Sequence, residues 1–111
     1  MNNKYTSDEA KKNLIDHIKK TNRELGIYEW HADNMSKPST DDLKRTTAAP
    51  TRNYLNGLLS AYELIYGKNK GLQDLREYLL QRRVRVHEFL SAARRLYWER
   101  NREGSDENQS K

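Results

Sequence analysis

Apolar residues recur at helical spacing in three stretches of the chain, separated by polar or turn-forming residues. The first stretch has apolar residues three or four positions apart, the period of one face of an α-helix: Leu14, Ile15, Ile18 and Leu25. Thr6 and Glu9, before this stretch, have the spacing of a capping box, and Gly26 after it is a typical C-terminal cap. We therefore predict a helix over about 7–25.

A polar stretch follows, and Pro38 and Pro50 interrupt it. Ser39 or Thr40 can cap a short helix over about 40–46. The stretch is longer than an ordinary connection in a small domain, so we expect part of it to pack against the helices. The residues able to anchor it are apolar: Ile27, Tyr28, Trp30 and Met35.

The second helical stretch opens at Thr51 and ends before Gly67, which predicts a helix over 51–66. Its apolar residues lie on one face: Leu55, Leu58, Leu59, Tyr62, Ile65 and Tyr66. Gly57 lies inside this helix and costs about 1 kcal/mol relative to alanine, unless close packing requires a glycine there.

The last stretch, over 72–102, contains no proline or glycine, and as one helix it is about 46 Å long. Its apolar residues form a nearly heptad seam, interrupted at Arg82: Leu72, Leu75, Leu79, Val86, Leu90, Ala93 and Tyr97. Residues 83–86 alternate between arginine and valine as a strand would, so a break near 82–85 remains an alternative to one continuous helix.

These elements predict an all-α fold, a bundle of three main helices with a short helix or turn between the first two. A chain of this length usually forms one domain, so we predict a single domain over residues 1–103. The polar tail 104–111 is predicted to be disordered. The seam of the last helix is longer than a domain of this size needs, so we also expect a homodimer.

Composition narrows the picture to a small, basic protein with a marginal core. Leu, Ile, Val and Phe make up 20 of the 111 residues, seven tyrosines and two tryptophans add apolar area, and the net charge is +5. No cysteine is present, which excludes a disulfide framework and a thiolate site. No apolar run approaches the ~20 residues of a membrane span, and the first residues have no apolar signal core, so a cytoplasmic protein is expected.

Motifs for catalysis are absent from the sequence. It has neither paired metal-binding histidines, nor a glycine-rich phosphate loop, nor a nucleophile elbow, so we expect no enzyme and no cofactor. Glu29, His31 and Asp33 would face one way if their stretch were extended, as metal ligands do. A solvated polar loop around Trp30 is the favoured interpretation, and no metal site is predicted.

A helix-turn-helix is one candidate for nucleic-acid recognition. A short helix ending near 46, a turn over 47–50 and a helix opening at Thr51 have the right order. Arg52, Asn53 and Asn56 would then stand at the start of the second helix, where base-reading side chains belong. The second helix is more apolar than a helix lying in a DNA groove should be, so a loop followed by a core helix is the stronger alternative.

The charge pattern of the last helix carries most of the functional signal. Between residues 72 and 102 eight arginines face four acids, so this helix alone is +4. On a helical wheel one line, here called the arginine line, runs along it with Trp98 at its border: Arg76, Arg83, His87 and Arg94. The line either contacts phosphates or an acidic protein surface, or covers the core edge with arginine stems whose heads pair with neighbouring acids.

The sequence thus predicts a non-catalytic regulatory protein, with nucleic acid as the favoured partner. The alternative is an adaptor or inhibitor that docks Tyr- and Arg-rich helix faces on a larger protein, since both residue types are enriched at interfaces. Small basic helical chains of this kind occur among regulators of phages and other mobile elements, which is an analogy only.

Overall fold

The computed structural model describes the backbone of residues 2–34 and 39–110, and the side chains of residues 8–34 and 41–101. The elements follow one another as α1 (Asn2–Asn34), α2 (Ser39–Leu43), a π-helical segment η1 (Lys44–Ala48), α3 (Ala49–Tyr66) and α4 (Lys70–Ser110). The predicted all-α fold is confirmed, and no strand occurs among the described residues.

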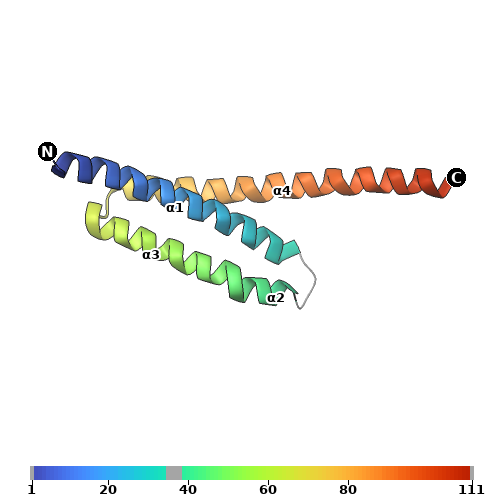
Figure 1. Ribbon diagram of the computed structural model, residues 1–111, viewed down its shortest axis with the longest axis horizontal. Coiled ribbons are helices and arrows are strands. Elements are labelled where there is room, and N and C mark those ends of the chain that lie inside the picture. Colours follow the sequence, from blue (N-terminus) through green and yellow to red (C-terminus); the bar gives the residue numbers. More distant parts are fainter. Residues whose placement is uncertain (1, 35–38, 111) are drawn as a thin grey trace.

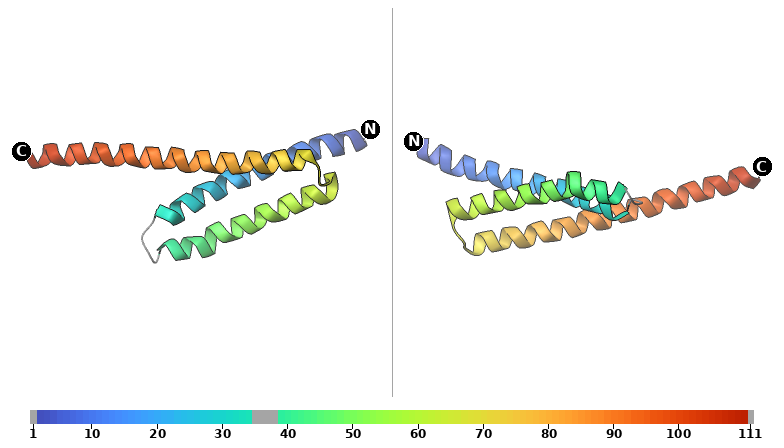
Figure 2. Two further views of the ribbon diagram at one scale, coloured as in Figure 1. Left: turned by 180° about the vertical axis from the view of Figure 1, so that it is seen from behind. Right: turned by 90° about the horizontal axis from the view of Figure 1, so that it is seen from below.

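The helices form an elongated bundle measuring 73 × 27 × 24 Å. α1 and α4 point in the same direction, and α3 runs back in the opposite one (Figure 1). α1 packs closely against both α3 and α4, whereas the backbones of α3 and α4 lie further apart and these two helices share the core through their side chains. The views from behind and from below show that α4 extends well past the end of the other helices (Figure 2).

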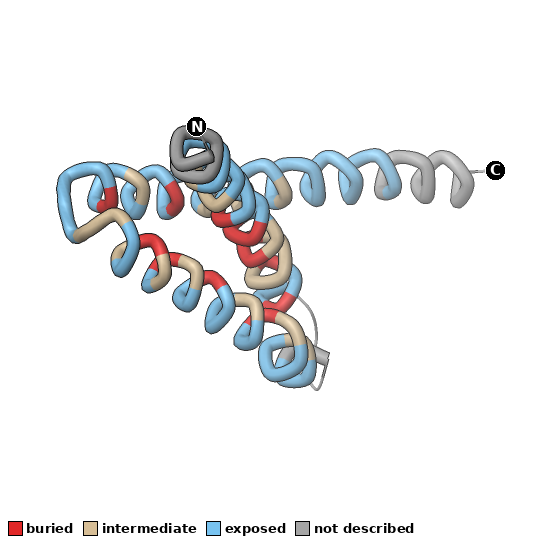
Figure 3. Tube along the Cα trace, turned by 60° about the vertical axis from the view of Figure 1, so that its left-hand side comes forward, coloured by how far each residue is buried: buried red, intermediate tan, exposed pale blue. Residues whose placement is uncertain are grey.

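The core lies where the three long helices come together. It consists of buried side chains from all three: Ile18, Leu25, Leu55, Leu59, Tyr62, Leu72 and Leu79. These residues confirm the apolar periodicity in each helix. Ile65 is the exception in α3, because it lies on the edge of its helix that no neighbour covers and is 66% exposed. The outer part of α4 is exposed along its described length (Figure 3).

Both predicted ends of the first helix are wrong, because α1 begins at Asn2, ahead of the expected cap at Thr6, and continues through Gly26 to Asn34. Gly26 is buried against α4, and a Cβ at this position would lie 3.5 Å from side-chain atoms of Arg83 and Val86. This is an ordinary van der Waals distance, so the contact with α4 has room for a Cβ, and Gly26 lies inside a continuous helix and does not cap it. Trp30 packs inside the bundle as part of this extra length, while Met35 and Pro38 lie outside the described residues.

The predicted turn over 47–50 is also wrong, because α2, η1 and α3 follow one another without a break. Pro50 lies in the first turn of α3, where its missing N–H is tolerated. The backbone before it adopts the wider π-helical register, in which the N–H of Ala49 donates to the carbonyl of Lys44. The hydroxyl of Thr51 donates to the carbonyl of Thr47 at 2.7 Å. This continuity rules out the helix-turn-helix.

The turn into α4 and the absence of a break in that helix agree with the sequence, whereas its length exceeds the predicted range 72–102. Gly67 ends α3 with φ of 93°, a backbone conformation that favours glycine. The side-chain oxygen of Asn69 accepts a hydrogen bond from the N–H of Leu72 and so caps α4. α4 is one helix with no break near 82–85, and its bounds reach Ser110. The side chains of 102–111 lie outside the described residues, so the disorder of 104–111 stays a prediction.

Candidate binding surface

The structure separates the members of the arginine line. Arg76 is exposed, whereas Arg83 and His87 are half-buried. The stem of Arg83 packs over Gly26 of α1, as in the interpretation that arginine stems cover the core edge. Trp98 lies beyond the end of α1 and is 59% exposed.

Arg94 contacts the C-terminal end of α1. Its guanidinium donates to the side-chain oxygen of Asn34 at 2.9 Å and lies 3.5 Å from the backbone carbonyl of the same residue. A cation at the C-terminus of a helix is favourable because of the helix dipole. One turn before it, the indole N–H of Trp30 donates to the hydroxyl of Ser91 at 2.8 Å. These two contacts mark the point where α1 stops covering α4.

A groove between α3 and α4 brings together residues of both helices that the sequence predicted to bind a partner. Arg76 and Arg83 line it on the α4 side and Asn56 on the α3 side, and its volume is about 220 Å³. Asn22 of α1 also lines it, a residue that the sequence did not single out. A lone asparagine within a helical pattern carries no signal of burial, so only packing could reveal its place.

Asn22 is a buried polar side chain with one unsatisfied atom. It is 1% exposed, and its Nδ2 donates to the backbone carbonyl of Leu79 at 3.0 Å. Because that carbonyl can only accept, the orientation of the amide group is fixed. The Oδ1 has no hydrogen-bond partner among the described residues. A buried acceptor left without a donor costs about 1–3 kcal/mol, so this atom needs an explanation.

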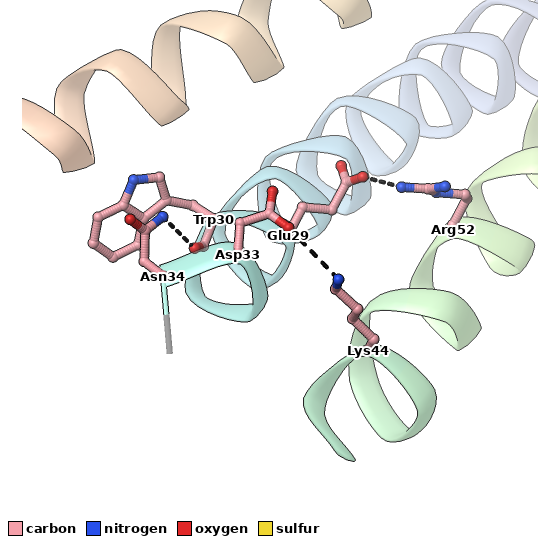
Figure 4. A network of polar contacts seen from close by, with 6 residues as sticks. All are labelled: Glu29, Trp30, Asp33, Asn34, Lys44 and Arg52. Carbon is pink, nitrogen blue, oxygen red and sulfur yellow. Dashed lines mark hydrogen bonds and ion pairs between the residues drawn. The ribbon is translucent and has the colours of Figure 1, made fainter. Parts of the chain in front are cut away.

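Arg52 and Asn53 lie elsewhere, at the far end of the bundle, in a cavity of about 450 Å³ between α1, η1 and α3. Arg52 forms an ion pair with Glu29, and Lys44 lies 3.9 Å from Asp33 (Figure 4). These pairs join the end of α1 to the helix opposite. Arg52 is therefore held by an acid of its own chain.

The three polar residues considered as metal ligands lie in the helix α1 and not in an extended stretch. Residues two apart on a helix point in nearly opposite directions, so Glu29, His31 and Asp33 do not converge. No group of three potential metal ligands occurs in the described part of the chain.

The outer described part of α4, residues 91–101, is a surface that the sequence revealed only in part. Every side chain in it is exposed. It carries three large apolar residues that are 59–63% exposed: Leu96, Tyr97 and Trp98. Tyr97 belongs to the predicted seam, but Leu96 drew no attention because it lies beside the seam. We call residues 91–101 the projecting segment.

The apolar seam of α4 is covered only as far as the end of α1. Leu72 and Leu79 are buried, Val86 and Leu90 are half-buried, and Tyr97 is exposed. The inner part of the seam is thus used within the chain, which leaves only its outer residues for a second copy. The predicted homodimer stays a prediction.

Comparison with known proteins adds no family: no family model, no curated protein and no solved structure matches the chain. None of the helices, over the described residues, is both long enough and apolar enough to cross a membrane.

Proposed function

We propose that this protein is a non-catalytic protein-binding module of the cytoplasm that uses the projecting segment of α4 to bind a partner. The observation that carries the proposal is the exposure of Leu96, Tyr97 and Trp98 on a helix that has left its own bundle. Consecutive residues of a helix point about 100° apart, so these three side chains present apolar surface around more than half of the helix, and tyrosine, tryptophan and arginine are the residues enriched in binding hot spots.

The arrangement of the arginines favours a protein partner over nucleic acid. The sequence argument for nucleic acid depended on charge, on arginine enrichment and on a helix-turn-helix, and the last of these does not exist. Arg94 is engaged with Asn34, and Arg83 is half-buried, so the arginine line is not a free row of phosphate contacts. Aliphatic Leu96 on the projecting segment suits an apolar protein face better than a phosphate backbone.

Photo-crosslinking from two positions of the full-length chain tests the proposal. A photoreactive phenylalanine analogue replaces Trp98 in one variant and Glu88, which is exposed on the inner part of α4, in the other. In the native cells, position 98 should yield discrete protein adducts that position 88 does not. Equal adducts from both positions, or none from position 98, would contradict the proposal.

Nucleic-acid binding remains a second candidate because the arginines of α4 outnumber its acids. The acids Asp74, Glu77 and Glu88 gather away from the arginine line on the helical wheel. If the arginine line contacts phosphates, replacing Arg76, Arg83 and Arg94 with glutamine should weaken the salt dependence of DNA or RNA binding. The slope of the logarithm of the binding constant against the logarithm of the salt concentration should fall by about one for each lost contact. Titration with labelled oligonucleotides at two salt concentrations measures this. A wild-type chain that binds neither at low salt eliminates this candidate.

A further inference from the structure

A hollow of about 430 Å³ lies between α1 and α4, just before the projecting segment begins. Its apolar lining comes from both helices: Ile27, Val86, Phe89 and Leu90. Three of these residues are half-buried, whereas Phe89 is 72% exposed and so lies at the rim. A hollow of this size, with a mainly apolar lining and a few charged groups, is typical of a site for a small ligand.

The charge of the hollow has one sign, because three arginines complete its lining and no acid does. They are Arg23 of α1 and Arg82 and Arg85 of α4, and all three are exposed. The ion pairs found among the described residues use other cations: Lys44, Arg45 and Arg52. The three guanidinium groups of the hollow can therefore bind an anion, and the planar guanidinium group matches a carboxylate with two parallel hydrogen bonds.

The charged and the apolar residues lie toward opposite ends of the hollow. On α1, Arg23 comes one turn before Ile27, and on α4 both arginines come before all three apolar residues. α1 and α4 point in the same direction (Figure 1), and Gly26 lies against Val86, so the two helices change from charged to apolar at the same level. Helical side chains tilt toward the N-terminus of their helix, which carries the guanidinium groups further from the apolar residues. The hollow thus has a basic end and an apolar end.

We infer that the hollow between α1 and α4 binds one molecule of an anionic amphiphile, a carboxylate with an unbranched alkyl chain. The carboxylate accepts hydrogen bonds from the arginines at the basic end. The alkyl chain lies at the apolar end between Ile27 and Phe89, where it covers apolar surface that the fold leaves exposed. This site goes beyond the proposed function, because it lies on the inner part of α4 and does not include the projecting segment.

Isothermal titration calorimetry of the full-length chain tests the apolar end with two probes, decanoate and butanoate, both below the concentrations at which they form micelles. The two probes carry the same carboxylate and differ only in the length of the alkyl chain. Decanoate should bind at least tenfold more tightly than butanoate, because each further methylene group that the hollow covers adds to the affinity.

The basic end is tested by removing two of its charges. Arg82→Gln with Arg85→Gln should weaken the binding of decanoate at least fivefold, and both side chains are exposed, so the fold does not depend on them. Arg76→Gln with Arg95→Gln removes the same charge from exposed positions of α4 outside the hollow and should change the binding by less than twofold.

A truncation at the rim tests whether the alkyl chain lies in this hollow and not elsewhere on α4. Phe89→Ala should weaken the binding of decanoate at least threefold, with an unchanged circular dichroism spectrum, because it removes an exposed wall of the hollow. Leu96→Ala truncates an exposed apolar residue of the same helix outside the hollow and should change the binding by less than twofold.

Equal binding of decanoate and butanoate, no binding of decanoate, or equal weakening by the two pairs of arginine variants would overturn the inference. Binding of phosphatidylglycerol vesicles without binding of monomeric decanoate would overturn it in favour of a membrane surface. If decanoate fails to bind while position 98 still crosslinks to proteins, the inference about the hollow is wrong and the proposed function stands. If decanoate binds but position 98 yields no adducts, the hollow is a ligand site and the proposed role of the projecting segment is wrong.

Discussion

The two halves of α4 have the same kind of sequence and different surroundings. Leu79 and Tyr97 lie on the same line of the helix, five turns apart, and both belong to the apolar seam. Leu79 is 3% exposed and Tyr97 is 62% exposed. The inner half packs against α1, whereas the projecting segment meets the end of α1 at its start, through Ser91 and Arg94, and its side chains are exposed. Periodicity therefore shows which side of a helix is apolar, but the length of the neighbouring helix decides how much of that side is covered.

Truncating one seam residue in each half of α4 should give the largest difference in stability between the two halves. Leu79→Ala should lower the free energy of unfolding by about 2–5 kcal/mol, because it removes a buried side chain and leaves a cavity. Tyr97→Ala should change it by less than about 0.5 kcal/mol, as expected for an exposed position. Urea unfolding of both variants measures the difference. Similar losses would mean that the projecting segment is packed in solution.

A buried hydrogen bond tests the covered half independently of apolar packing. Asn22→Ala should lower the free energy of unfolding by about 1–3 kcal/mol, because it removes the contact between α1 and the carbonyl of Leu79. Asn13→Ala, at an exposed position of the same helix, is the matched control and should change it by less than about 0.5 kcal/mol. Equal unfolding curves for the two variants would contradict the burial of Asn22.

Two glycines inside helices allow a covered and an uncovered helix face to be compared: Gly26 lies against α4, and Gly57 lies on the exposed face of α3. Gly26→Leu should lower the free energy of unfolding by about 1–3 kcal/mol, because the side chain must displace Arg83 and Val86. Gly57→Leu should raise it by about 0.5–1 kcal/mol, since nothing lies within 4 Å of a Cβ there and leucine favours the helix. Thermal melts of both variants provide the measurement. Stabilisation at both sites would show that α1 and α4 are further apart than the structure has them.

The contact between Arg94 and Asn34, at the boundary between the two halves of α4, should contribute little to the free energy of unfolding. Arg94→Gln removes the charge at the C-terminal end of α1 and should lower the free energy of unfolding by at most about 1 kcal/mol, as for other exposed polar pairs. Arg95→Gln, which changes an exposed arginine with no such contact among the described residues, should have no measurable effect. A larger effect at Arg95 would place the boundary elsewhere.

The sequence predicted the elements well where apolar spacing and turn residues agreed. The helix over 51–66 and its end at Gly67, the continuous last helix and most of the core residues follow from that agreement. The errors lie where a single residue type has two uses. Gly26 was interpreted as a cap although it lies inside a continuous helix, and Pro50 as part of a turn although the first turn of a helix accepts it.

The candidate site could be predicted only in part, because it depends on which helices touch. The wheel correctly placed Arg76 and Arg83 on one line, and both line the same groove. It could not show that Arg94 contacts Asn34, that Arg52 pairs with Glu29, or that Asn22 is buried. These are contacts between residues distant in sequence, and periodicity within one helix contains no information about them.

The stability of a chain that ends at Arg94 tests most directly whether the exposed end of α4 is independent of the core. This chain keeps the contacts of Trp30 and Arg94 but lacks Leu96, Tyr97 and Trp98. Its free energy of unfolding in urea should lie within about 0.5 kcal/mol of the full chain, because the projecting segment adds nothing to the core. A loss of several kcal/mol would show instead that these residues hold the fold together and are not reserved for a partner.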